Sequence, residues 1–501
     1  TSWMGLKEAL NARHACNLAG IPTYISPEKA VKAFMHMVIY QRVQALLQEI
    51  PPSLPFSTSP EIRAQCRMLI KGAKEQGRQT LTHSETAQVL EAYGIPTAPS
   101  VYLANPDEAL ARATEIPGTK ALKVVHEGNC RPYRYRKHPH KISAGLLQDL
   151  ETPEQVAEGV RRLGEKVAEK FPEYAIREYC LQPMQRGKHS MQICAGITRD
   201  PVFGPLIVFG IGGYKVNVLA DRQVALPPLN MSLAADVVGR THAASLIREH
   251  SADPDRDIQH LCQMLVKLSQ MASDLGDLRG LEVNPLLLNR DGMVAVDFAM
   301  DLGTPSRFAI MPYPEELREW VTLKNGWKVE VRPIRAEDAH LITTFHRQLS
   351  EESIRFRYFH NKSNLTQRDL SILSHINYDR QMAFIAEHLS EDGSKEMLGV
   401  VRVWNDPDNI RTEFSVIIRD DLQGLGIGSL LMNKMIAYCT NIGTLEMIGK
   451  IMVDNHPMRA LMKHLGFKSR YNMEEQVIDA VLRLNEPESE WQRHRLESLP
   501  D

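Results

Sequence analysis

A strand, a glycine-rich turn and a helix follow one another between residues 412 and 439, and this order constrains the C-terminal part of the chain most. Between residues 412 and 418, apolar or β-branched residues on one face alternate with Glu413, Ser415 and Ile417 on the other. This pattern is typical of a strand with two unlike faces. The turn reads Gln423-Gly-Leu-Gly-Ile-Gly428, and the apolar residues after it recur at helical spacing. Such a turn offers free backbone N–H groups at a helix N-terminus, where a pyrophosphate can bind.

The spacing of the turn excludes two common phosphate-binding motifs. No Gly-Lys-Ser/Thr closes it, as a Walker A loop requires, and neither its glycines nor a later acidic residue fit the dinucleotide-binding fingerprint. The turn does match Gln/Arg-x-x-Gly-x-Gly/Ala, and Asn455-His-Pro-Met-Arg-Ala-Leu-Met-Lys-His-Leu-Gly466-Phe467 follows downstream. On these two motifs, residues 326–485 resemble the N-acetyltransferases of the GNAT superfamily.

The resemblance implies an acetyl-CoA site built from the strand, the turn and the start of the helix. The residues concerned are Val416, Ile418, Gln423, Gly424, Leu425, Gly426, Ile427, Gly428, Ser429 and Asn455. A second interpretation of Asn455 stays open, because an asparagine directly before His-Pro is also a typical N-cap of a helix. Acetyl-CoA is the expected cofactor.

Acetyl transfer to a lysine requires a neutral amine, whose ordinary pKa is about 10.4. A carboxylate base is therefore useful, and Glu413, on the strand before the turn, is the candidate; the alternative is a solvated strand residue. A backbone N–H of the splayed strand can stabilise the developing oxyanion. Many relatives carry a tyrosine as general acid where this chain has Met462, so water or the bare thiolate is expected to take that role.

The middle segment resembles the ATP-grasp domain of NDP-forming acyl-CoA synthetases. The text that carries this resemblance is Ala121-Leu-Lys123, Asp200-Pro-Val-Phe-Gly-Pro, Gly210-Ile-Gly-Gly213 and Leu281-Glu-Val-Asn284-Pro-Leu with Asp297. The resemblance implies that Lys123, Gln182 and Met184 contact a nucleotide, ATP or ADP. It also implies that Asn284 and Asp297 hold Mg²⁺, which prefers oxygen ligands.

Three departures from the ATP-grasp pattern suggest that this domain is degenerate. Gln192 and Asn217 stand where relatives carry carboxylates, and their loss should weaken the handling of Mg-nucleotide. The run Arg131-Pro-Tyr-Arg-Tyr-Arg-Lys-His-Pro-His-Lys141 resembles an insertion; a solvated loop, a phosphate-contacting loop and a nucleic-acid contact stay open for it. The domain is expected to sense a ligand and no longer to ligate.

The first fifty residues contain one clear helix, expected from Pro27 to about Ile50 with Ser26 as N-cap and Glu28 in its first turn. Trp3-Met-Gly, Ala-Gly-Ile-Pro and Pro-Glu-Lys-Ala-Val-Lys-Ala-Phe resemble the end of the flavodoxin-like CoA-ligase domain that precedes ATP-grasp in the same synthetases. The chain is therefore expected to be N-terminally truncated.

Proline-rich breaks at 50–60 and 303–314 divide the chain, because such stretches cannot continue a helix. The expected fold class is α/β multidomain with α+β units. We expect a CoA-ligase remnant at 1–52, an ATP-grasp-like domain at 60–315, a GNAT domain at 326–485 and a polar tail at 486–501. Expected elements are helices at 82–93 and 336–349 and strands at 121–126, 206–209, 293–298, 327–333, 382–388, 397–404 and 412–418.

The amino-acid composition limits the kinds of partner that this chain is expected to bind. Lys and Arg number 59 and Asp and Glu 61, so the chain lacks the basic excess of a dedicated nucleic-acid or membrane-surface protein. No apolar run approaches the length of about 18 residues that a membrane helix needs. The seven cysteines form no CxxC pair, which is typical of reduced thiols in a cytoplasmic protein.

The order of a synthetase-like part before an acetyltransferase is similar to bacterial protein lysine acetyltransferases that modify acyl-CoA synthetases. This resemblance implies acetylation of a protein partner such as AMP-forming acetyl-CoA synthetase, and it leaves a homo-oligomer open. Three alternatives remain: an NDP-forming acyl-CoA synthetase with an appended regulatory GNAT domain, a non-catalytic sensor of CoA metabolites, and a small-amine acetyltransferase.

Overall fold

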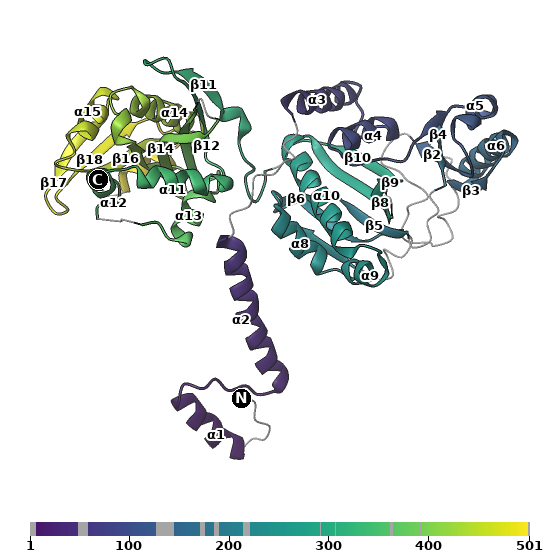
Figure 1. Cartoon of the computed structure of the whole chain (residues 1–501), viewed down its shortest axis with the longest axis horizontal. Coiled ribbons are helices and arrows are strands. Elements are labelled where there is room, and N and C mark those ends of the chain that lie inside the picture. Colours follow the sequence, from purple (N-terminus) through teal and green to yellow (C-terminus); the bar gives the residue numbers. More distant parts are fainter. Residues whose placement is uncertain are drawn as a thin grey trace. The chain divides into compact units, whose positions relative to one another are not determined.

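The computed structural model describes residues 7–48, 59–126, 145–170, 176–184, 190–213, 221–290, 292–305, 307–360, 364–390 and 393–498 (Figure 1). The chain divides into two compact units, one of Ser53–Pro312 and one that joins Thr1–Pro52 to Tyr313–Asp501. Four features named above lie outside the described residues, namely Trp3-Met-Gly, positions 50–58 of the first proline-rich break, the run Arg131–Lys141 and Asn217. The predicted domain bounds stay predictions.

Two helices, α1 (Lys7–Leu18) and α2 (Pro27–Gln48), begin the described chain. α2 starts at the predicted residue, and the Ser26 hydroxyl accepts a hydrogen bond from the Lys29 amide at 3.3 Å, as an N-cap does. Apolar side chains of α2, among them Phe34 and Tyr40, are exposed. No helix in the described part of the chain is both long and apolar enough to cross a bilayer.

The unit Ser53–Pro312 contains two sheets whose named strands pair antiparallel. The smaller sheet has the order β1-β4-β2-β3, with β1 (Val101–Leu103), β2 (Lys120–His126), β3 (Leu146–Leu150) and β4 (Ile176–Pro183). The larger sheet has the order β10-β8-β5-β6-β7, and β9 pairs with β8. Its strands are β5 (Met191–Asp200), β6 (Gly204–Ile211), β7 (Arg222–Ala225), β8 (Leu278–Asn289), β9 (Gly292–Ala295) and β10 (Phe298–Leu302).

Helices bury an apolar side of each of these sheets. α5 (Pro106–Arg112) and α6 (Pro153–Lys170) contribute to the core of the smaller sheet. The core of the larger sheet includes α3 (Pro60–Glu75), α4 (His83–Ala92), α8 (Met231–Gly239), α9 (His242–His250) and α10 (Pro254–Asp274). α4 matches the helix predicted at 82–93, because Thr82 and Glu85 form a capping box at its start.

The strand predicted at 293–298 is wrong, because the chain forms two strands there. β9 pairs with Leu286–Asn289, and β10 pairs with the earlier part of β8. Pro285 lies opposite the break and has no amide hydrogen to donate to a ladder. Val296 and Asp297 therefore lie between two short strands, and the Asp297 carbonyl accepts from the Asn284 amide at 2.8 Å.

The C-terminal unit is built on one eight-stranded sheet with the order β11-β12-β13-β14-β15-β16-β18-β17 (Figure 1). β15 and β16 form its parallel pair, and the other neighbours are antiparallel. The strands are β11 (Glu319–Thr322), β12 (Lys328–Pro333), β13 (Gln381–Leu389), β14 (Lys395–Asn405), β15 (Arg411–Ile418), β16 (Glu446–Met452), β17 (Lys468–Asn472) and β18 (Val477–Arg483). The strands predicted at 327–333, 382–388, 397–404 and 412–418 are confirmed.

Two separate cores cover the two faces of this sheet. α14 (Ile427–Asn441) and α15 (His456–His464) pack on one face. The helix predicted at 336–349 is α11 (Ala339–Arg347) after a short 3₁₀ turn, and α11 packs with α13 (Gln367–Ser374) on the other face. α12 (Glu351–Tyr358) contacts β15, and α16 (Glu490–Ser498) ends the described chain.

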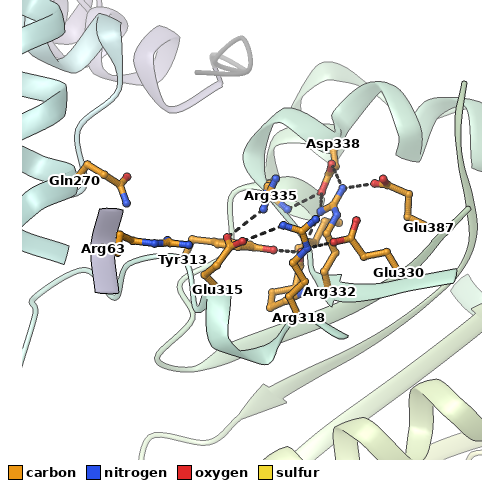
Figure 2. Close-up of polar contacts among 12 residues, drawn as sticks. Arg63, Gln270, Tyr313, Glu315, Arg318, Glu330, Arg332, Arg335, Asp338 and Glu387 are labelled. Carbon is orange, nitrogen blue, oxygen red and sulfur yellow. Dashed lines mark hydrogen bonds and ion pairs between the residues drawn. The ribbon is translucent and has the colours of Figure 1, made fainter. Parts of the chain in front are cut away.

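A buried network of charges lies at β12 and β13 (Figure 2). The Arg332 guanidinium donates to both carboxylate oxygens of Asp338 at 2.8 Å and to Glu387 at 2.5 Å. All three side chains are buried, and Lys395 pairs with Glu387 at 2.8 Å. Arg318 pairs with Glu330 and also with Glu315 at the edge of the network. Burial is tolerable because each charge has a partner.

Candidate functional site

The centre of the candidate site is the point where β15 and β16 part. Their parallel pairing covers Arg411, Thr412 and Glu413, opposite Glu446, Met447 and Ile448, and no later residue of β15. On its other edge, β15 pairs with β14 as far as Ile418. Beyond Glu413, the β16 side of β15 thus has backbone groups without a strand partner, and a ligand with amide groups can bind along such an edge.

The glycine turn follows directly and forms the N-terminus of α14. Gly424 and Gly426 have φ of 85° and 89°, values that favour glycine because a side chain would be strained. The first helical hydrogen bond is that of the Leu430 amide to the Gly426 carbonyl at 3.0 Å. The amides from Gly426 to Ser429 are therefore available at the positive end of the helix dipole, as an anion site requires.

Several side chains border this turn. A Cβ added to Gly428 would lie 3.4 Å from Leu461 of α15 and 3.8 Å from Ile418, so the turn packs closely against β15 and α15. A Cβ on Gly426 would lie 4.0 Å from Lys324 Cε. Lys324 belongs to the turn between β11 and β12, and the sequence analysis missed it because it lies about a hundred residues away.

Glu413 lies at the parting of the strands with its side chain exposed. The alternation predicted for this strand is confirmed, because Phe414 is in the α14 core whereas Ile417 contacts the α11 core. Glu413 therefore shares a face with Ser415, and its carboxylate acts electrostatically on Arg357 and Lys450. An exposed carboxylate at this point of the strand can take a proton from an amine that comes within hydrogen-bond reach.

The structure confirms one of the two interpretations of Asn455. Its Oδ1 accepts a hydrogen bond from the Met458 amide at 3.1 Å, and α15 begins at the next residue. Asn455 is therefore an N-cap, and a contact with acetyl-CoA stays a prediction. Met462, on the same helix, is fully buried in the core, so this position contributes no proton donor.

In the other unit, two predicted nucleotide residues share one sheet face. Lys123 and Ala121 of β2 lie opposite Cys180 and Gln182 of β4, and residues two apart on a strand point to the same side. Gln182 is almost fully buried, and its Nε2 donates to Ser100 at 2.9 Å. Its Oε1 has no hydrogen-bond partner among the described residues, so one buried acceptor is available to a ligand.

Lys123 is held by protein groups. Its Nζ donates to the Val296 carbonyl at 2.6 Å and lies 3.9 Å from Asp297. His83 also lies 3.9 Å from Asp297 and stacks on Phe298 at 4.1 Å. Met184 directly follows β4, and its amide donates a hydrogen bond to the Thr119 carbonyl at 2.8 Å.

The two predicted Mg²⁺ ligands, Asn284 and Asp297, are adjacent, and each side chain has protein partners. Asn284 Oδ1 accepts from the Gly213 amide at 2.7 Å, while Asp297 faces Lys123 and His83. Nowhere in the described ranges do three His, Cys, Asp or Glu side chains gather as metal ligands would. Gln192, the departure noted above, lies against Gly213, where an added Cβ would collide with its amide oxygen. Mg²⁺ commonly keeps several waters and is held by one or two protein carboxylates together with substrate phosphates, so Mg²⁺ binding by Asn284 and Asp297 stays a prediction.

Comparison with known families agrees with this division of the chain. A family model described as an acetyltransferase (GNAT) domain matches residues 328–468, and one described as an ATP-grasp domain matches residues 72–302. The predicted fold class, a multidomain α/β chain with an ATP-grasp domain followed by a C-terminal GNAT domain, is confirmed. The remnant expected before them stays a prediction.

Individual relatives cover different parts of the chain. An acetyltransferase of Pseudomonas aeruginosa is 33% identical over 149 residues, which are 30% of this chain and 80% of that protein. An ADP-forming acetate–CoA ligase of Archaeoglobus fulgidus is 27% identical over 301 residues, which are 60% of this chain and 42% of the ligase. The solved GNAT domain of PAT from S. lividans is 23% identical with a TM-score of 0.32, and it covers 34% of this chain and 100% of that domain.

Proposed function

Because the chain belongs to the acetyltransferase (GNAT) family through its C-terminal domain, we propose that it transfers the acetyl group of acetyl-CoA to the ε-amine of a lysine on another protein. One observation carries the proposal: Glu413 lies where β15 and β16 part, on the strand that leads to the glycine turn and α14. A base, an open strand edge and an anion-binding helix end therefore follow one another along one strand and the turn after it.

Each part of this site has a distinct task. The amides from Gly426 to Ser429 would hold the pyrophosphate of acetyl-CoA, with Lys324 as a nearby cation. Backbone groups of β15 beyond Glu413 would hold the amide-containing arm and stabilise negative charge on the thioester oxygen. The bound acetyl-CoA supplies an activated acetyl group. Glu413 accepts the proton of the lysine ammonium, which makes the amine a nucleophile.

In this proposal the departing thiolate receives its proton from water, and that water takes up the second proton that the lysine nitrogen loses as the amide forms. Met462 is buried in the core and has no proton to give. A thiol has an ordinary pKa of about 8.5, so the thiolate is a tolerable leaving group near neutral pH. The reaction thus needs one base from the protein and no tyrosine acid at that position.

The synthetase-like unit is proposed to regulate this transfer. Lys123 and the unsatisfied acceptor of Gln182 lie on one sheet face, which suits a nucleotide or a CoA metabolite. The expected target is an AMP-forming acyl-CoA synthetase, and the protein is expected to be bacterial and cytoplasmic, all by the resemblance stated above.

A second candidate is an ADP-forming acyl-CoA ligase that carries the acetyltransferase as a regulator. The relationship to the A. fulgidus ligase favours it. Gln192 and Asn217, which stand where relatives carry carboxylates, count against it. Cleavage of acetyl-CoA that depends on ADP and phosphate would support the ligase, and acetyl transfer to lysines without nucleotide would support the acetyltransferase.

Glu413→Gln tests the proposed base. The purified chain is incubated with acetyl-CoA and a bacterial lysate, acetyl-lysines are mapped by mass spectrometry, and the rate on a mapped acceptor is then measured. We expect the variant to be about a hundredfold slower at pH 7, the usual contribution of a general base. The deficit should shrink as the pH approaches about 10.4, where lysine loses its proton unaided.

Glu474→Gln is the matched control, since Glu474 is an exposed acid on the turn before β18 and has no part in the proposed chemistry. It should leave the rate unchanged. If Glu413→Gln and the control variant have equal rates at neutral pH, Glu413 is not the base.

A further inference from the structure

A second polar feature of the C-terminal unit has no part in the transfer proposed above. It is a cavity of about 30 Å³ between the sheet and the helices α11, α12 and α13. Most of its wall is apolar and includes Ile342, Phe345, Leu349, Leu373, Val400 and Ile417. Two cations, Arg357 of α12 and Arg402 of β14, also line it.

Arg402 is only 4% exposed. No carboxylate among the described residues forms an ion pair or hydrogen bond with Arg402 or with Arg357. Glu413 acts on Arg357 electrostatically, and the Arg357 guanidinium lies 5.2 Å from the centre of the Tyr358 ring. Burial, together with the positive charge of Arg357, lowers the pKa of Arg402 to about 9. A buried guanidinium without an ion-pair partner is costly to a fold, so an anion bound beside Arg402 would offset that cost.

Ser415 offers a hydroxyl next to the cavity, beside the lining residues Arg402 and Ile417. It lies directly opposite Arg402 in the pairing of β14 and β15, and its buried Oγ has no hydrogen-bond partner in the described part of the chain. Ser415 and Glu413 are two residues apart on one strand and share a face, so they are separated by about 7 Å. The cavity therefore lies beside the proposed base.

We propose that this cavity binds a carboxylate, held between Arg357, Arg402 and the Ser415 hydroxyl. A guanidinium offers a planar fork that matches a carboxylate, and the volume suits a group of two or three heavy atoms, since one water needs about 10–15 Å³. The carboxylate alone fills this volume, so the aliphatic stem attached to it has to extend out of the cavity. The carboxylate belongs either to the acceptor, near its reactive amine, or to a free short-chain acid.

Propionate is the probe for direct binding, with propionamide as its uncharged isostere. Calorimetric titration of the full chain at constant ionic strength should show propionate binding at least about tenfold more tightly than propionamide, because a charge-assisted fork is lost in the amide. Arg402→Met should lower propionate affinity by about tenfold or more. Arg347→Met is the matched control, since Arg347 lies on the wall helix α11 but is exposed; it should bind propionate as the unchanged chain does.

Two results would overturn the carboxylate site: equal affinity for propionate and propionamide, or unchanged propionate affinity in Arg402→Met. Arg357→Met is the second variant if Arg402→Met does not fold, and the same affinity loss is expected of it. This binding experiment is independent of acetyl transfer, so it can succeed even if the proposed function fails.

A second experiment identifies the source of the carboxylate and rests on the proposed function. Peptides with an acceptor lysine mapped by mass spectrometry are made with Asp or Asn near that lysine. If the acceptor supplies the carboxylate, kcat/KM is about tenfold higher for the Asp peptide, and Arg402→Met removes this preference without changing the KM for acetyl-CoA. Equal kcat/KM for the two peptides, with propionate binding intact, assigns the site to a free acid.

Discussion

At the scale of single residues, the C-terminal unit contains two arginines in opposite situations. Arg332 and Arg402 are both buried on strands of one sheet. Arg332 has Asp338 and Glu387 as partners (Figure 2), whereas Arg402 has no carboxylate partner in the described residues. Arg332 has a structural role, because the two carboxylates neutralise its charge within the fold. Arg402 is a candidate binding residue, because only a ligand would supply the carboxylate that neutralises its charge.

Arg332→Met should destabilise the C-terminal unit by about 3–5 kcal/mol, since it leaves Asp338 and Glu387 buried without their cation. Urea unfolding measures this change. The control is Arg335→Met, because Arg335 pairs with Glu315 at 3.2 Å and is partly exposed, so a loss of about 1 kcal/mol or less is expected. Equal losses in the two variants would contradict the structural role of Arg332.

The same network predicts a pH dependence of stability. Burial alone would raise the pKa of Glu387, but Arg332 and Lys395 hold it below the ordinary value. A depressed pKa stabilises the fold above the unfolded value, about 4.3, and this contribution disappears as the pH falls through the folded value. The free energy of unfolding should therefore rise between about pH 3 and about pH 5, and Arg332→Met should flatten that rise. A variant with the unchanged slope would disprove the link.

At the scale of elements, α14 connects the strand that carries Glu413 with the proposed cofactor site. Its N-terminus begins at Gly426 with φ of 89°, and its C-terminal end is followed by Gly443 with φ of 80°. An added Cβ at Gly443 would meet no atom within 4 Å, and one at Gly426 only Lys324. The two glycines therefore have the same backbone requirement and differ mainly in their distance from the proposed pyrophosphate.

Gly426→Ala and Gly443→Ala separate conformational strain from binding. Each should cost about 1 kcal/mol of stability or somewhat more, because alanine is disfavoured at positive φ. Gly426→Ala should also raise the KM for acetyl-CoA by about tenfold, since the methyl group and the strained turn displace an amide that would contact phosphate. Initial rates over a range of acetyl-CoA concentrations provide the measurement. A similar KM in both variants would exclude the turn as the phosphate site.

At the scale of the whole molecule, each of the two compact units has its own hydrophobic core. The clusters of Ser53–Pro312 contain no residue of the C-terminal sheet, and the reverse also holds among the described residues. Separate cores allow separate unfolding. A regulatory signal from one unit to the other would therefore have to act on the population of states rather than through one shared core.

Differential scanning calorimetry of the full chain should show two transitions. Arg332→Met should lower the temperature of one of them and leave the other in place, because its charge network lies wholly in the C-terminal unit. Lys123→Met provides the reciprocal comparison in the other unit. One transition that shifts as a whole in both variants would show that the units unfold together.

Much of the fold could be predicted because local patterns decide local structure. The alternation from Thr412 to Ile418 and the capping residues Ser26 and Thr82 each specify an element through contacts within a few residues. The split of the strand predicted at 293–298 could not be foreseen, because it depends on which part of β8 pairs with each half. Asn455 was ambiguous for a similar reason, since the N-cap and the ligand interpretations share one sequence signal.

The sequence by itself determined the glycine turn, the strand that carries Glu413 and the order of the two domains. It did so because glycine at positive φ, period-two alternation and motif spacing are properties of the chain alone. Only the tertiary structure decided that β15 and β16 part at Glu413, that Lys324 lies by the turn, and that Arg357 and Arg402 line one cavity. These features bring together residues that are far apart in the chain. The electrostatic effect of a charged side chain depends on whether burial removes it from water, which only the tertiary structure determines.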